Sequence, residues 1–182
     1  GKTVIAAAAM YLAAKNGCQA AMMAPTEVLA SQHFNDLSPI LSELGFKTAL
    51  LTGSTKKKEK DEIYERLQSG ETSIIFGTHA LITEKVHFHR LALAVTDEQH
   101  RFGVRQRALL SEKSSAVHTL VMTATPIPRT LALIMYGDMD ISFIDSLPPG
   151  RQKIDTFCID RGKLARMYGF IRRETAAGNR AY

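Results

Sequence analysis

The feature that most constrains the fold is a regular alternation of short apolar runs with helix-forming segments. Apolar runs that suit β-strands lie at residues 19–24, 47–51, 73–76, 91–96 and 118–122. Segments rich in helix formers lie before the first run and between later ones, at residues 4–15, 27–44 and 56–67. Strands that alternate with helices at this spacing predict an α/β fold, with a parallel sheet that carries helices on both faces.

The same alternation continues towards the end of the chain. It predicts helices at 104–110, 128–136 and 163–175, and strands at 139–144 and 153–159. The segment Leu-Pro-Pro-Gly-Arg has the composition of a linker. We therefore predict a domain at 1–146 that lacks its first strand, a linker at 147–151, and the truncated start of a second domain at 152–182.

The net charge of +5 comes entirely from the C-terminal part of the sequence. Residues 1–150 contain 15 Lys or Arg and 15 Asp or Glu, whereas residues 151–182 contain 8 and 3. The charge of the main domain therefore gives no reason to expect nucleic-acid binding, and such a prediction must depend on particular residues.

The composition also bears on the environment of the protein. No apolar run approaches the ~18 residues of a membrane span, so we expect no membrane association. Cys18 and Cys158 lie far apart in sequence, and we expect two free thiols in a reducing, cytoplasmic compartment. Because the chain begins inside a motif, we expect its natural N-terminus, with any targeting sequence, to lie upstream of Gly1.

Two polar clusters have the composition of an ATP site. Gly1-Lys2-Thr3 matches the end of the phosphate-binding loop G-x-x-x-x-G-K-[ST], whose lysine reaches the β- and γ-phosphates and whose hydroxyl binds Mg²⁺. Asp97 and Glu98 directly follow an apolar run that suits a strand buried on both faces. Adjacent carboxylates on a strand point in opposite directions, so one can hold a metal ion while the other orients a water. Together the clusters predict one half of an ATP hydrolysis site.

Further blocks of sequence carry a recognisable pattern. They are Ala-Pro-Thr-Glu-Val-Leu-Ala at 24–30, Gly-Thr-His-Ala-Leu-Ile at 77–82, Asp-Glu-Gln-His-Arg-Phe-Gly-Val at 97–104, Thr-Ala-Thr-Pro-Ile-Pro-Arg-Thr at 123–130 and the linker at 147–151. These blocks resemble the RecG family of branch-migrating DNA helicases over nearly the whole chain, with 97–104 and 123–130 similar to its motifs II and III. Related transcription-repair coupling translocases usually read Asp-Glu-Glu-His, so Gln99 favours RecG. Thr96 is a departure, since the family usually has an aliphatic residue there.

The resemblance implies a RecA-like P-loop NTPase lobe followed by the start of a second, similar lobe. Lys2 would neutralise charge on the phosphates of ATP, while Thr3 and Asp97 would hold Mg²⁺. Glu98 would orient the attacking water. The residues expected to contact the nucleotide are Gly1, Lys2, Thr3, Gln99 and His100.

The resemblance also implies residues that contact DNA or couple it to the ATP site. The DNA contacts would be made by short hydroxyls and glycines at strand ends, which suit phosphate oxygens and read no sequence. Plain turn chemistry is the alternative explanation for the same residues. The predicted DNA-binding and coupling residues are Pro25, Thr26, Thr52, Gly53, Ser54, Gly77, Thr78, Thr123 and Thr125, with Gln99 and His100 also linking the γ-phosphate to DNA.

The activity that the resemblance implies is ATP-driven regression of forks and branch migration of Holliday junctions in DNA repair and recombination. The expected partners are branched or forked DNA, and a second helicase lobe and an N-terminal wedge domain of the same polypeptide. The isolated chain is expected to be inactive, because the arginine fingers of the second lobe are missing. Two alternatives remain open: a duplex DNA translocase of the transcription-repair coupling type, and a non-catalytic nucleotide- or DNA-binding module.

Overall fold

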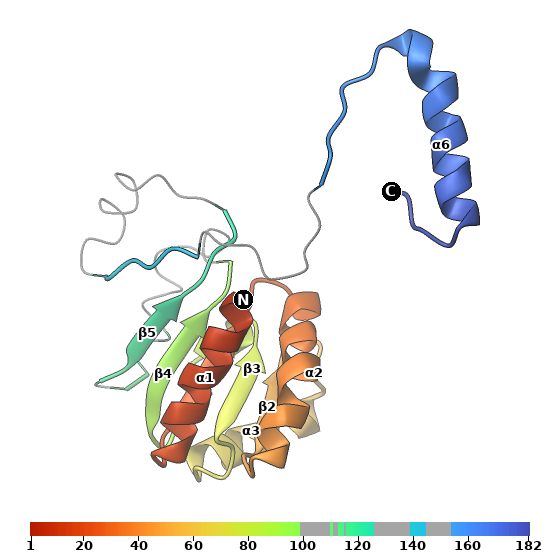
Figure 1. Ribbon diagram of the computed structural model, residues 1–182. Helices are drawn as coiled ribbons and strands as arrows, with labels where there is room; N and C mark the ends of the chain where they lie inside the picture. The colour runs from red at the N-terminus through yellow and green to blue at the C-terminus, as the bar shows by residue number, and fades with distance from the viewer. Residues whose placement is uncertain (99–109, 111–112, 115, 126–138, 145–153) are drawn as a thin grey trace. The chain divides into compact units, whose positions relative to one another are not determined.

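The computed structural model describes residues 1–98, 110, 113–114, 116–125, 139–144 and 154–182 (Figure 1). The chain divides into two compact units, Gly1–Ile144 and Asp145–Tyr182. The predicted helices at 104–110 and 128–136 lie outside the described residues, apart from Leu110.

The first unit is organised around a five-stranded sheet. Its strands lie in the order β2 (Thr48–Leu51), β3 (Ile74–Gly77), β1 (Gln19–Met23), β4 (Leu91–Thr96) and β5 (His118–Val121). Every neighbouring pair runs parallel. The carboxyl ends of all five strands therefore meet at one edge of the sheet, where ligands of such folds bind.

Helices cover both faces of this sheet (Figure 1). Helices α1 (Lys2–Lys15) and α2 (Glu27–Glu43) pack on one face. Helix α3 (Lys57–Gln68) and the short 3₁₀ helix η1 (His79–Ile82) pack on the other. The predicted parallel sheet with helices on both faces is confirmed.

Alternation of side chains along β1 divides the core into two hydrophobic clusters. Met22 joins the cluster that contains Met10 of α1 and Leu41 of α2. Its neighbour Met23 points the other way and joins the cluster that contains Leu67 of α3. A strand that buries both faces explains why residues 19–24 read as a continuous apolar run instead of an alternating one.

A buried amide joins three segments at the amino end of the sheet. Gln19 Nε2 donates to the carbonyl oxygens of Leu67 at 2.9 Å and Thr72 at 2.8 Å. Gln19 Oε1 accepts the backbone N–H of Arg90 at 3.0 Å. Because the side chain is only 3% exposed, water cannot replace these bonds.

We predict that Gln19→Leu lowers the free energy of unfolding by about 3 kcal/mol, because it leaves buried backbone groups without partners. Urea unfolding followed by circular dichroism measures the change. Gln68→Leu, at an exposed position near the end of α3, is the control and should change stability by less than about 0.5 kcal/mol. Equal free energies of unfolding for the two variants would show that the hydrogen bonds of Gln19 do not stabilise the fold.

Two predicted strands are wrong. Residues 139–144 and the described part of 153–159 form no strand, and every residue in them except Met139 is exposed. Ile141, Phe143 and Ile154, for example, are 39%, 54% and 77% exposed. Apolar composition alone does not make a strand, because an extended segment also needs a neighbour to take its backbone hydrogen bonds.

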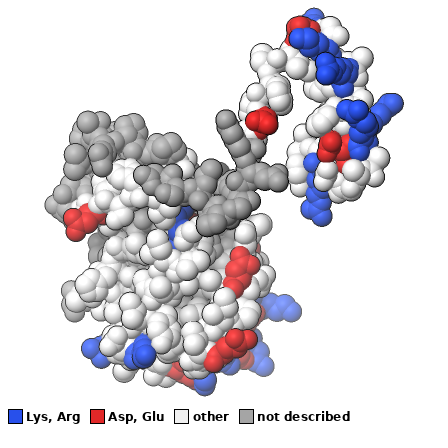
Figure 2. Space-filling model, in the orientation of Figure 1, with Lys and Arg blue, Asp and Glu red and all other residues white. Residues whose placement is uncertain are grey.

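The described part of the second unit is an extended segment followed by helix. A 3₁₀ turn, η3 (Arg161–Lys163), leads into α6 (Leu164–Ala176), which confirms the helix predicted at 163–175. Basic side chains gather on this unit, in agreement with its excess of Lys and Arg (Figure 2). That it begins a second RecA-like lobe stays a prediction.

Two expectations from composition can be compared with the structure. Cys18 and Cys158 are both free, as predicted. Among the described residues, none of the helices combines the length and apolar character that a membrane span needs.

Candidate functional site

Three predicted site residues that are distant in sequence come together at the carboxyl edge of the sheet. Helix α1 begins at this edge, and Lys2 Nζ donates to the backbone carbonyl of Thr123 at 2.9 Å. Thr123 follows the end of β5, and Asp97 follows the end of the adjacent β4. Asp97 lies within range of the Lys2 charge, which is the smallest of the contributions to the pKa of its carboxyl and lowers it. The structure thus assembles Lys2, Asp97 and Thr123 into one site.

An irregularity in β4 determines which way Asp97 faces. Gln19 is paired with Leu91, but the next residue of β1 is paired with Leu93, so one residue of β4 is extra. Leu91 consequently packs on the α3 side, whereas Leu93 and Val95 pack on the side of α1 and α2. A β-bulge of this kind reverses the alternation. It directs Asp97 towards α1 and α2.

Asp97 is held by hydrogen bonds to both carboxylate oxygens. His33 Nε2, on α2, lies 2.8 Å from Asp97 Oδ2, and the Glu98 N–H donates to Oδ1 at 3.0 Å. Burial alone would raise the pKa of Asp97, but the hydrogen bond and charge of His33, with Glu98 N–H and Lys2, outweigh it and lower the pKa. The carboxyl is therefore ionised near neutral pH, as a metal ligand must be.

Glu98 is placed by a turn and not by strand alternation. β4 ends at Thr96, and Glu98 has a φ of 49°, in the left-handed region. This conformation is uncommon for residues other than glycine and costs about 1–2 kcal/mol. Such strain is typical of functional positions. The prediction that Asp97 and Glu98 point in different directions is compatible with this geometry. The expected cause was alternation along a strand, whereas the structure has a turn at Glu98.

The residues at this edge fit a magnesium–nucleotide complex. The Thr3 hydroxyl in the first turn of α1 and the Asp97 carboxylate supply oxygen atoms, which Mg²⁺ prefers. The first turn of α1 contains no acidic residue, so no carboxylate of the helix itself opposes the positive end of its dipole. A helix N-terminus of this kind suits phosphate.

The predicted DNA-contact turn at residues 52–54 is hydrogen-bonded to the carboxylate of Glu27. Ser54 donates its backbone N–H to Glu27 Oε1 at 2.9 Å and its hydroxyl to Glu27 Oε2 at 2.7 Å. These bonds lower the pKa of Glu27. Thr52 is buried, and its hydroxyl lies 3.0 Å from the Ser54 hydroxyl. An incoming phosphate would therefore compete with Glu27 for the donors of Ser54.

The other predicted DNA and coupling residues occupy varied positions. Thr26 is the N-cap of α2 and accepts the Leu29 N–H. Pro25 is partly exposed, whereas Thr78 is buried and its hydroxyl has no partner within the described part of the chain. Thr125 lies with its hydroxyl 2.8 Å from that of Thr123. Gln99 and His100 lie outside the described residues.

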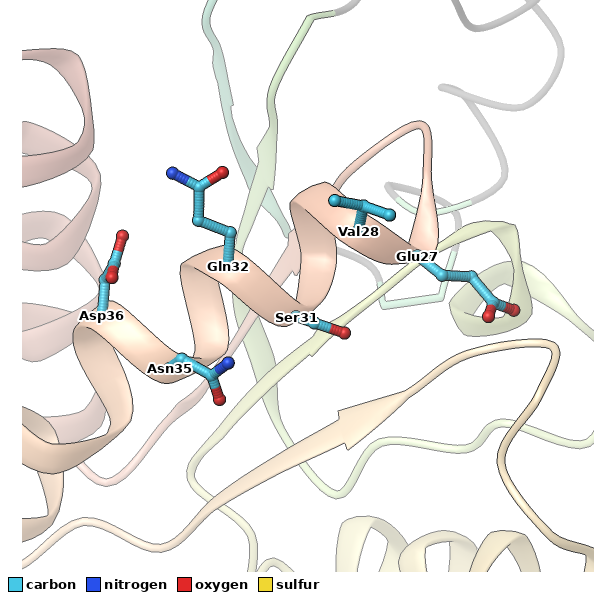
Figure 3. Close-up of a pocket in the computed structure, with 6 residues that line it drawn as sticks. All are labelled: Glu27, Val28, Ser31, Gln32, Asn35 and Asp36. Atoms are coloured by element: carbon cyan, nitrogen blue, oxygen red, sulfur yellow. The ribbon is translucent and has the colours of Figure 1, made fainter. Parts of the chain in front are cut away.

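An open hollow lies along the outer side of α2 (Figure 3). Glu27, Val28, Ser31, Gln32, Asn35 and Asp36 line it. The lining carries two carboxylates and no Lys or Arg, so it does not suit the phosphates of a nucleotide or of DNA.

His33 was not among the site residues predicted from the sequence. Its position was detectable, because Ala30, His33, Leu37 and Leu41 form the buried side of α2 at helical spacing. A histidine on such a stripe needs a polar partner. Nothing in the sequence identified Asp97 as that partner.

Comparison with known proteins gives concordant matches. The family model described as DEAD/DEAH box helicase matches residues 1–134. The chain is 53% identical to ATP-dependent DNA helicase RecG of Synechocystis sp. over all of its length and 22% of the relative. It is 48% identical to RecG of Bacillus subtilis over all of its length and 27% of that relative. The chain thus spans about a quarter of the length of these relatives.

A solved structure described as RecG bound to a three-way DNA junction is also similar. It matches with a TM-score of 0.84 and 43% identity, over 98% of this chain and 24% of that one. The resemblance to RecG and the RecA-like α/β fold, both predicted from the sequence, are confirmed.

Proposed function

Because this chain belongs to the DEAD/DEAH box helicase family, we propose that it is the ATP-binding motor lobe of an ATP-dependent DNA helicase of the RecG kind. In the full-length protein, ATP hydrolysis would drive regression of forks and branch migration of Holliday junctions. The observation that carries the proposal is the meeting of Lys2, Asp97 and Thr123 at the carboxyl edge of the sheet.

The residues of this edge have distinct roles in the proposed reaction. The ammonium of Lys2 would bind the β- and γ-phosphates, and Glu98 would orient and polarise the attacking water. Thr3 and Asp97 would hold Mg²⁺, which when bound neutralises part of the phosphate charge. Because phosphoryl transfer depends on positioning and on charge stabilisation, the protein needs no covalent step.

Lys2 also offers a link between ATP and the segment that follows β5. Its ammonium is bonded to the Thr123 carbonyl, so phosphate binding would draw Lys2 away from Thr123. Thr125, whose N–H donates to the Thr123 hydroxyl at 3.2 Å, would respond to that change. This is the route by which we propose that nucleotide binding reaches the coupling residues.

DNA binding is proposed for the turns at the same edge. The matched RecG structure is described as bound to a three-way junction, which supports branched DNA as the partner. A second lobe and an N-terminal wedge domain are proposed as further parts of the full-length protein, with residues 152–182 as the beginning of the second lobe. A cytoplasmic location is proposed because the similar relatives are DNA helicases.

The test compares ATPase rates of the full-length protein on forked DNA and on linear duplex of equal length, at one fixed salt concentration. We expect much stronger stimulation by the fork. Equal stimulation by both substrates would favour a duplex translocase of the transcription-repair coupling type. An absence of stimulation and turnover would favour a non-catalytic nucleotide- or DNA-binding module.

A further inference from the structure

We propose that His33 is a positioning residue of the ATPase site, which holds the Asp97 carboxylate in the orientation that Mg²⁺ requires. This inference rests on the proposed function. It starts from one contact, the 2.8 Å hydrogen bond between His33 Nε2 and Asp97 Oδ2. His33 and Asp97 are 7% and 9% exposed, so water competes little for the bond.

The contact fixes the rotation of the carboxylate. Oδ2 is bound to His33, and Oδ1 accepts the backbone N–H of Glu98 at 3.0 Å. With a partner on each oxygen, the plane of the carboxylate cannot turn freely about its Cβ–Cγ bond. Each oxygen retains a further lone pair for a metal ion or its water. Asp97 is thus oriented before any ligand arrives.

His33 can impose this orientation because α2 is firmly anchored. Leu37 and Leu41, one and two turns further along α2, are buried in the cluster that contains Val95 of β4. The Thr26 side chain caps the beginning of the helix. A histidine between the cap and the buried leucines has little freedom to move. Its ring therefore restrains the position of the Asp97 carboxylate.

A purely structural role is the competing explanation. In that case the His33–Asp97 bond would only fasten α2 to the sheet, and its loss would lower stability without changing how the site binds metal. A positioning role predicts a separate effect. Partners that orient a metal ligand typically change metal affinity by about 10–100-fold when they are removed.

The test measures binding of a fluorescent, non-hydrolysable ATP analogue at increasing Mg²⁺ concentrations, in a full-length protein that carries this chain. His33→Leu removes the donor and should raise the Mg²⁺ concentration at half-saturation by about 10–100-fold. His33→Gln can place an amide N–H near the position of Nε2 and should restore most of the affinity. His33→Asn is also an amide but is too short, so it should resemble His33→Leu.

Leu41→Ala is the matched control. Leu41 is buried on the same side of α2 but joins the apolar cluster, so its truncation should lower the thermal midpoint and leave the Mg²⁺ half-saturation unchanged. An unchanged half-saturation in His33→Leu would overturn the proposal. If His33→Leu does not fold, equal values for His33→Gln and His33→Asn would overturn it. Failure of the unsubstituted protein to bind the analogue at any Mg²⁺ concentration would instead refute the proposed function.

Discussion

Replacing Glu98 by Gln in a full-length protein should lower the turnover number for ATP by ~10²–10⁴-fold, while nucleotide binding stays nearly unchanged. The amide keeps the size of the side chain but cannot polarise the attacking water as a carboxylate does. Glu98 follows directly on Asp97, and its left-handed backbone (φ 49°) turns it out of the strand direction. Asp97 remains in place to hold Mg²⁺, which is why binding should survive.

The measurement pairs steady-state ATPase rates on forked DNA with binding of a fluorescent nucleotide. Glu43→Gln, at an exposed position at the end of α2, removes the same charge away from the site and should leave both quantities unchanged. Turnover by Glu98→Gln at the rate of the unsubstituted protein would show that this carboxylate does not act on water. Loss of binding together with turnover would point to a structural role for Glu98.

The strands that carry the site could be predicted because they are buried on both faces. Burial on both faces gives a continuous apolar run, and the run at 91–96 ends directly before the two carboxylates. In a parallel sheet the carboxyl ends meet at one edge, so the order of elements places Lys2 and Asp97 at the same edge. The strands were predicted from local composition, and their common edge was predicted from the general topology of parallel sheets.

The direction of Asp97 could not be predicted in this way. It depends on a register shift between β1 and β4, in which Leu93 takes the place that regular pairing would give to Ala92. Nothing in the composition of the run marks the extra residue. The contact with His33 depends on that shift and on the position of α2 across the sheet, so it is a property of the assembled lobe.

The strand predictions failed where a neighbour was needed. Residues 139–144 have a suitable composition, but they do not form a strand of the sheet. Composition reports whether a segment can be a strand, whereas pairing depends on which segments lie beside it. Composition likewise does not say why a glycine occurs in a predicted DNA motif. A packing requirement predicts that its replacement lowers stability without DNA, whereas a DNA contact alone does not.

Gly77→Ala should lower the free energy of unfolding by about 3 kcal/mol or more, with no DNA present. A Cβ at Gly77 would overlap the carbonyl oxygen of Leu51 on the adjacent strand and would lie 2.9 Å from Leu81 Cγ. The backbone oxygen cannot move without breaking the pairing of β2 with β3. Packing therefore accounts for the glycine, whether or not it also contacts DNA.

Gly53→Ala is the matched control, because Gly53 belongs to another predicted DNA-contact turn. A Cβ there would lie 2.9 Å from Glu27 Oε1, the end of an exposed side chain that can move aside if it gives up its hydrogen bonds to Ser54. The free energy of unfolding of Gly53→Ala should therefore fall by about 1 kcal/mol or less. Urea unfolding of both variants decides the matter. If Gly77→Ala unfolds at the same urea concentration as Gly53→Ala, the packing explanation is wrong, and DNA contact becomes the better reason for a glycine at this position.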